Sequence, residues 1–154
     1  MDMLVKLYDL PDSRDIFAQV AAAGISVRRA MAPDRHKVVT FVKNEFSEAW
    51  ASETEVAFAR QPITCFIAAR ERDPVGFACH DATCANFFGP TGVHESVRNQ
   101  GVGKALLFAC LQDMRAQGYA YAIIGGVGPV EFYEKAVGAI AIEGSAPGIY
   151  RGLL

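Results

Sequence analysis

The residues with the clearest capacity for chemistry form one short run that contains two glycines and two basic side chains: Arg98, Asn99, Gln100, Gly101, Val102, Gly103 and Lys104. A long helical pattern follows directly. The first amides of a helix have no carbonyl partners, and the helix dipole adds partial positive charge there, so such a turn can hold a phosphate or pyrophosphate. Arg98 adds a forked cationic donor and Lys104 a second positive charge. The run therefore predicts an anion-binding turn at the start of a helix.

Two better-known phosphate-binding loops do not fit this run. A P-loop that ends at Gly103 and Lys104 requires glycine at the position of Arg98 and serine or threonine at the position of Ala105. A dinucleotide-binding fingerprint that begins at Gly101 requires glycine or alanine at the position of Leu106. Both motifs fail on residue identity.

Periodicity and turn residues predict the elements that must position this run. The expected strands are residues 4–10, 63–69, 75–79, 87–93, 119–124, 139–142 and 148–154. The expected helical segments carry residues 16–21, 33–50, 52–58, 101–117 and 130–137. Gly89 and Pro90 fall inside the expected strand at 87–93, and such residues usually mark a bulge, so we expect that strand to bend. The chain is thus predicted to be α/β, with a mostly helical first third.

The motif Arg98-x-x-Gly101-x-Gly103, followed by apolar residues, resembles the acyl-CoA-binding signature of the GNAT superfamily of N-acetyltransferases. A second landmark of that family, an aromatic residue followed by Tyr-Glu-Lys at a helix start, is similar to the run Phe132, Tyr133, Glu134 and Lys135. The resemblance covers residues 63–150. The spacing of several matched elements makes it far more specific than the turn alone.

The resemblance implies a fold and an activity. The fold is a mixed, largely antiparallel central sheet flanked by helices, with a bulged strand before the CoA-binding turn that parts from the next strand to admit the pantetheine arm. The activity is direct transfer of an acetyl group from acetyl-CoA to a primary amine, with no metal. Tyr133 would be the general acid that protonates the leaving CoA thiolate. The implied cofactor-binding residues are Val93, Arg98, Asn99, Gln100, Gly101, Val102, Gly103 and Lys104.

Three positions depart from the family pattern. Gly126 and Pro129 stand where the family often has asparagine and alanine, and Ala139 stands where it has phenylalanine. These departures leave two alternatives open. A non-catalytic acyl-CoA-binding or sensing module would bind CoA without turnover, and a pure interaction protein on the same fold would bind no CoA.

The sequence does not single out a base for the amine. Four candidates fall near predicted strand ends: His80, Asp81, His94 and Glu95. Four acids in the helical first third have the pattern of a solvated helix face, although they can also attract a cationic acceptor: Glu45, Glu48, Glu53 and Glu55. The acceptor itself, a small-molecule or peptide amine, cannot be read from these positions.

The cysteines predict neither a disulfide framework nor a metal site. The chain has four of them, at positions 65, 79, 84 and 110, without a CxxC pair, so we expect reduced thiols. Cys79, His80, Asp81 and Cys84 are close in sequence, but no second half-site with matching spacing exists. An acyl-carrying role for Cys79 or Cys84 has no support, since nothing nearby in the sequence lowers a thiol pKa.

Composition narrows the class of protein. With 154 residues, 51% of them hydrophobic, the chain has the size and apolar content of one domain, and we expect residues 1–154 to form it. A net charge of −2 leaves no basic excess for nucleic acid or an anionic membrane, so neither is an expected partner. The first residues lack a signal-peptide pattern and no stretch reaches the length of a membrane span, so we expect a cytoplasmic protein. The oligomeric state stays open and includes a homodimer.

Overall fold

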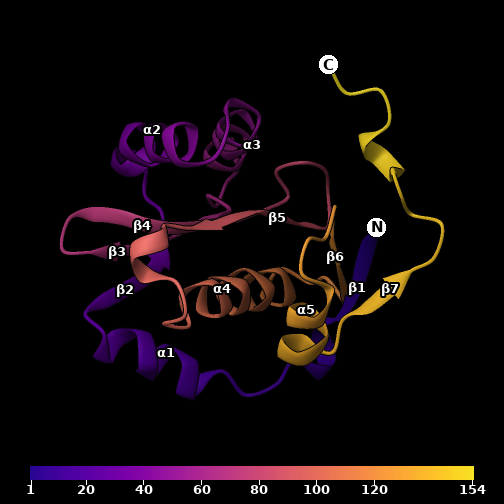
Figure 1. Ribbon diagram of the computed structural model, residues 1–154, viewed down its shortest axis with the longest axis horizontal. Coiled ribbons are helices and arrows are strands. Elements are labelled where there is room, and N and C mark those ends of the chain that lie inside the picture. Colours follow the sequence, from indigo (N-terminus) through magenta and orange to yellow (C-terminus); the bar gives the residue numbers. More distant parts are fainter.

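The computed structural model describes residues 1–154, which form one seven-stranded sheet in the order β2-β3-β4-β5-β6-β1-β7 (Figure 1). The strands are β1 Asp2–Lys6, β2 Ile25–Arg29, β3 Cys65–Arg70, β4 Asp73–His80, β5 Phe87–Val93, β6 Tyr121–Ile124 and β7 Ile140–Ile142. Neighbouring strands are antiparallel except β5 and β6, which are parallel. The predicted mixed, largely antiparallel sheet is therefore confirmed.

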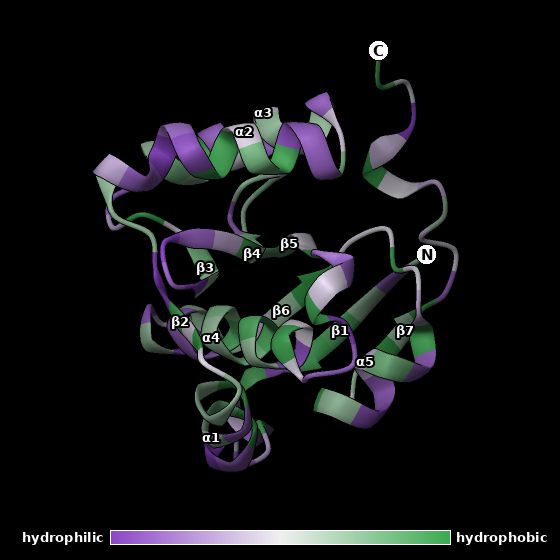
Figure 2. Ribbon diagram, turned by 60° about the vertical axis from the view of Figure 1, so that its left-hand side comes forward, coloured by the Kyte–Doolittle hydropathy of each residue, from purple (hydrophilic) through white to green (hydrophobic).

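Helices cover both faces of this sheet. They are α1 Arg14–Ala22, α2 Arg35–Glu45, α3 Glu48–Ala59, α4 Val102–Ala116 and α5 Val130–Val137. Figures 1 and 2 show α2 and α3 on one face, with α1, α4 and α5 on the other. No helix is both long enough and apolar enough to cross a membrane.

The central strands are apolar on both sides because each face packs against helices. On β3, Cys65 and Ile67 pack beneath α2 and α3, whereas Phe66 and Ala68 join the core around α4. Successive strand side chains point to opposite faces, so a strand covered on both sides becomes a continuous apolar run. This arrangement explains the unbroken hydrophobic texture of residues 63–69 in the sequence.

The prediction of a single helix over residues 33–50 is wrong, because the helix is interrupted between the end of α2 at Glu45 and the start of α3 at Glu48. Ser47, in extended conformation, is the N-cap of α3, and its hydroxyl accepts a hydrogen bond from the Trp50 amide at 3.1 Å. The Phe46 ring at the break stacks on Trp50, with centroids 5.5 Å apart. A Cβ on Gly92 of β5 would lie 2.5 Å from the Phe46 ring, so the break packs tightly on β5. This packing sets Trp50 beside the end of the sheet.

Three other expectations need correction. Residues 25–29, which the mostly helical first third left unassigned, form the edge strand β2; its alternating burial spans only five residues, too few for a clear periodic signal. The first strand ends at Lys6, and a 3-10 turn over Leu7–Asp9 replaces its second half. The strand expected at 148–154 is a 3-10 turn over Gly148–Tyr150, because Gly148 has a positive φ of 59° that extended structure does not allow.

Candidate functional site

β5 and β6 are paired for only two residues and then part. Their register joins Phe87 to Ile123 and Phe88 to Ile124. Beyond Ile124 the chain leaves the sheet as the loop 125–129, whereas β5 continues to Val93. The parted strands leave one edge of β5 without a neighbour in this stretch.

A bulge in β5 accompanies the parting. The Phe87 carbonyl accepts from the Asp81 amide at 2.9 Å, and the His94 amide donates to the Val75 carbonyl at 2.8 Å, so positions 87 and 94 both face β4. A regular strand would turn these two positions to opposite sides, so one extra residue is inserted between them. Because alternate residues face opposite neighbours, the Val93 amide points away from β4, toward the gap.

The glycine-containing turn at residues 98–104 follows β5 by way of a 3-10 turn at Glu95–Val97. Gly101 is the N-cap of α4 with φ at 83°, and no side chain caps this helix. A Cβ on Gly101 would lie 2.5 Å from Ile16 Cδ1, and Gln19 Nε2 donates to the Gln100 carbonyl at 3.1 Å. Helix α1 therefore supports the turn from behind, and glycine at 101 is required by the fold itself.

Gly103 is placed differently from Gly101. A Cβ at 103 would meet only Val93 Cγ2, at an ordinary contact distance of 3.5 Å, and the residue lines a hollow beside β5. Arg98 and Asn99 are exposed, Gln100 and Lys104 are half-buried, and neither basic side chain takes part in an ion pair. The Val102 side chain is buried in the core, which leaves only its backbone for a ligand.

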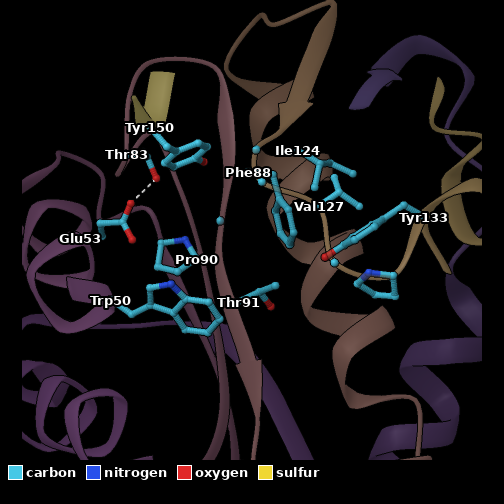
Figure 3. Close-up of a pocket in the computed structure, with 15 residues that line it drawn as sticks. Trp50, Glu53, Thr83, Phe88, Pro90, Thr91, Ile124, Val127, Tyr133 and Tyr150 are labelled. Atoms are coloured by element: carbon cyan, nitrogen blue, oxygen red, sulfur yellow. Dashed lines mark hydrogen bonds between the residues drawn. The ribbon is translucent and has the colours of Figure 1, made fainter. Parts of the chain in front are cut away.

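Two hollows meet at one end of the sheet. The larger, with a volume of about 480 Å³, lies among α3, β5, the loop 125–129 and the 3-10 turn Gly148–Tyr150 (Figure 3). The smaller, with a volume of about 320 Å³, lies among β5, α4 and α5 and reaches Val93 and Gly103. We call the larger one the acceptor pocket, for the role that we propose for it, and the smaller one the turn-side cleft. They share four lining residues, Phe88, Thr91, Pro129 and Tyr133.

Tyr133 stands at the junction of the two hollows. Its side chain comes from α5, is 7% exposed, and packs edge-on against Phe88 and Phe132. The hydroxyl makes no hydrogen bond with the rest of the chain and points into the hollow (Figure 3). Burial raises the pKa of Tyr133 above its ordinary value, so the phenol is protonated at neutral pH. The Tyr133 hydroxyl can therefore donate its hydrogen to a molecule bound in the hollow.

Glu53 belongs to the acceptor pocket, not to a purely solvated helix face as its sequence pattern indicated. It is half-buried on α3, and its carboxylate accepts a hydrogen bond from the Thr83 hydroxyl at 2.5 Å (Figure 3). The one sequence signal is its spacing of three from Trp50, which places both residues on the same face of a helix. This face of α3 therefore presents both an aromatic ring, from Trp50, and a carboxylate, from Glu53, to the pocket.

Tyr150 is a pocket residue that the sequence did not reveal. Its ring comes from the C-terminal 3-10 turn, and its hydroxyl lies so close to Gly125 that a Cβ on that residue would clash with it. Burial, together with the nearby carboxylates of Asp2 and Glu53, raises the pKa of Tyr150 to about 12. Tyr150 therefore adds a neutral aromatic wall to the pocket beside Gly125.

None of the four candidate bases lines either hollow. His80 is fully buried, with Nδ1 2.7 Å from Asp81 and Nε2 2.8 Å from Asp113, which also pairs with Arg29. His94 lies 2.7 Å from the Ser96 hydroxyl, and Glu95 is exposed. His80 and Asp81 therefore belong to a structural network.

The cysteine alternatives also lie outside the hollows. Cys79 is fully buried beneath α3, and Cys84 lines neither hollow. Burial raises the pKa of the Cys84 thiol, which makes it a poorer nucleophile.

Residues 35–139 match a protein-family model that is described as the Acetyltransferase (GNAT) family. Among solved structures, the glucosamine N-acetyltransferase region of a fungal multi-domain GH3 beta-N-acetylglucosaminidase superposes with a TM-score of 0.72 at 14% identity, over 88% of this chain and 19% of that one. A GCN5-related N-acetyltransferase from Sphaerobacter thermophilus gives 0.68 at 19% identity, over 90% and 47%. A GNAT family acetyltransferase from Brucella melitensis in complex with acetyl-CoA gives 0.53 at 15% identity, over 72% and 80%.

The chain spans less than half the length of the first two of these structures. No curated protein sequence matches it. At identities below one fifth, the likeness to solved structures shows a shared fold, and the family model adds membership over residues 35–139.

Proposed function

The chain belongs to the GNAT acetyltransferase family, and we propose that it transfers an acetyl group from acetyl-CoA directly to a primary amine. One observation carries the proposal. The turn-side cleft, which begins at an uncapped helix start, meets a separate pocket at Tyr133, a buried phenol with an unpaired hydroxyl. A thioester held from one side can thus reach an amine held from the other.

The proposed CoA site uses backbone groups more than side chains. The first-turn amides of α4 from Val102 to Lys104 have no side-chain cap, and they suit the pyrophosphate of CoA. Arg98 and Lys104 are free of ion pairs and would add positive charge at that position. The unpaired edge of β5, including the Val93 amide, suits the amide groups of the pantetheine arm. Binding at this edge would resemble the addition of a short strand to the sheet.

Three groups share the proposed chemistry. The amine nitrogen forms a bond to the carbonyl carbon of the thioester to give a tetrahedral intermediate, and the carbon–sulfur bond breaks as this intermediate collapses. The Val93 amide is available to stabilise the negative charge that develops on the carbonyl oxygen. Tyr133 donates its phenolic proton to the departing sulfur and regains a proton from solvent. Water in the open acceptor pocket takes the proton that the amine must lose.

A turnover assay with acetyl-CoA tests the proposal. We expect thiol release that depends on an added amine, together with a melting temperature raised by CoA, since a ligand that binds only the folded state stabilises it. The panel should contain monoamines, diamines, aminoglycosides, amino acids and peptide N-termini. Stabilisation by CoA without turnover on any amine would favour the sensing module. A flat melting curve and a flat calorimetric titration with CoA would overturn both functions.

A further inference from the structure

The acceptor pocket has one charged side chain. Of the 15 residues that line it, only Glu53 is an acid, and none is lysine, arginine or histidine. The other walls are mainly aromatic side chains, proline and backbone. The pocket therefore carries a net negative charge in an otherwise uncharged lining.

Glu53 also differs from the other acids of its helical layer, because it has no basic partner. Two of them form ion pairs within the chain, Glu48 with Lys43 at 3.0 Å and Glu55 with Arg35 at 3.3 Å, and the Glu45 carboxylate lies 3.5 Å from Nε2 of His94. Glu53 accepts one hydrogen bond, from the neutral hydroxyl of Thr83. A carboxylate has about four acceptor positions, so most of its hydrogen-bonding capacity is free.

The surroundings of Glu53 suit a cation. Trp50 lies on the same face of α3, and Tyr150 stands nearby across the pocket (Figure 3). Aromatic faces attract ammonium groups through their quadrupoles, and a half-buried carboxylate supplies the opposite charge. The carboxylate of Asp2, behind Tyr150, adds to the negative field. None of the salt bridges of the chain involves Glu53, and no basic side chain lines the pocket.

Glu53 and Tyr133 lie on opposite walls, one from α3 and the other from α5 (Figure 3). The reacting amine must be next to the thioester and therefore on the Tyr133 side. A carboxylate on the far wall faces a different part of the acceptor. Resting on the proposed function, we propose that Glu53 and Trp50 form a subsite for a second cationic group, so that the acceptor is a diamine or polyamine.

The competing role for Glu53 is that of the proton acceptor for the reacting amine. The two roles make different predictions. A subsite for a second charge changes the discrimination between a diamine and a monoamine, whereas a base acts on every amine alike. Discrimination, and not the loss of rate alone, is therefore the quantity to measure.

Putrescine, butylamine and γ-aminobutyrate share a four-carbon chain and differ at the end opposite the reacting amine. Trp50 is the one tryptophan of the chain, so its fluorescence reports occupancy of the acceptor pocket directly, in the presence of CoA and without turnover. We expect putrescine to bind at least about tenfold more tightly than butylamine, as a desolvated ion pair would provide, and γ-aminobutyrate to bind least.

Glu53→Gln is the matched variant, because the amide oxygen can still accept from Thr83 while the charge is removed. It should lower kcat/KM for putrescine about tenfold more than for butylamine, mainly through KM, and abolish the difference in binding. Glu48→Gln and Glu55→Gln on the same helix are controls that should preserve the difference. Melting temperatures check that each variant is folded.

The outcomes separate the subsite from the proposed function. Equal loss of kcat for both amines in Glu53→Gln would indicate that Glu53 is a base and would overturn the subsite. Binding of γ-aminobutyrate as tightly as putrescine would also overturn the subsite. If no amine is acetylated, yet putrescine binding still depends on Glu53, the subsite stands and the proposed transfer fails.

Discussion

The two sides of the hollow are built in different ways. On the CoA side, β5, the turn and the start of α4 are contiguous over residues 87–104, and backbone amides supply most of the proposed contacts. On the acceptor side, Trp50, Glu53, Thr83 and Tyr150 come from α3, the loop after β4 and the C-terminal turn. A site made of backbone is encoded locally and is visible in the spacing of residues. A site made of distant side chains exists only after folding.

Tyr133 lies where the two sides meet, and Tyr133→Phe should have the largest effect. The change removes a hydroxyl without a partner in the chain, so the packing against Phe88 and Phe132 should survive. A positioned proton donor contributes on the order of 10² to 10⁴ in rate, so the single-turnover rate should fall by that factor while the CoA dissociation constant is unchanged. A wild-type single-turnover rate in the folded variant would remove Tyr133 from the chemistry.

Gly103→Val tests the backbone-built side. The new side chain would occupy the turn-side cleft next to Val93, where the proposed pantetheine and pyrophosphate contacts lie. We expect the CoA dissociation constant to rise about 30-fold, the equivalent of roughly 2 kcal/mol, with little change in melting temperature. Calorimetry with CoA measures the first quantity. Unchanged affinity would show that the phosphates bind elsewhere.

Gly101→Ala is the contrasting change in the same turn. Here the φ of 83° and the approach of Ile16 oppose any Cβ, so the expected loss is in the free energy of unfolding, about 1 to 2 kcal/mol. Denaturant titration measures it. A stable Gly101→Ala protein that lost only CoA affinity would mean that both glycines serve the ligand alone.

Tyr150→Ala tests the side-chain-built half. The change removes a wall of the acceptor pocket, whereas Tyr150 does not line the turn-side cleft. Loss of one aromatic contact of about 1 kcal/mol should raise the KM for the acceptor roughly fivefold and leave the CoA dissociation constant unchanged. An equal effect on both constants would mean that the two sides are not separable.

Lowering the pH should reduce the stability of the whole fold, because Asp113 belongs to a structural network that lines neither hollow. Burial alone would raise the pKa of Asp113, but hydrogen bonds from Arg29 and His80 outweigh burial and hold that pKa below its ordinary value. A carboxyl whose folded pKa is depressed adds stability that is present above its unfolded pKa, about 4, and is lost as pH falls through the folded pKa. We expect the melting temperature to decrease as the pH is lowered from about 4. In Asp113→Asn, the melting temperature should depend less steeply on pH in this range. An unchanged slope in the variant would contradict that account.

The sequence is sufficient to predict the features that depend on residues close together in the chain. The spacing of Arg98, Gly101 and Gly103 located the turn, and the Gly89-Pro90 pair predicted the bend in β5, because both depend on neighbouring backbone conformations. The role of Tyr133 stays a prediction from the resemblance, since nothing in its own surroundings in the sequence distinguishes it from a core aromatic residue.

The remaining parts depend on contacts between distant segments. Glu53 has the same sequence pattern as Glu48 and Glu55, and only the break at Phe46, packed on Gly92, turns its helix face toward the pocket. Tyr150 reaches the pocket because Gly148 turns the chain back after β7, where an extended run was expected. Such side chains cannot be assigned before the fold is known.

The most direct test of the central claim is a rapid-quench experiment with stoichiometric acetyl-CoA and an accepted amine, followed by mass spectrometry of the acceptor and of the intact chain. Direct transfer between the two sides predicts one acetylated amine for each thiol released, with the mass of the chain unchanged at every time point. Acetyl transiently attached to the chain, or thiol released without acetylated amine, would contradict it.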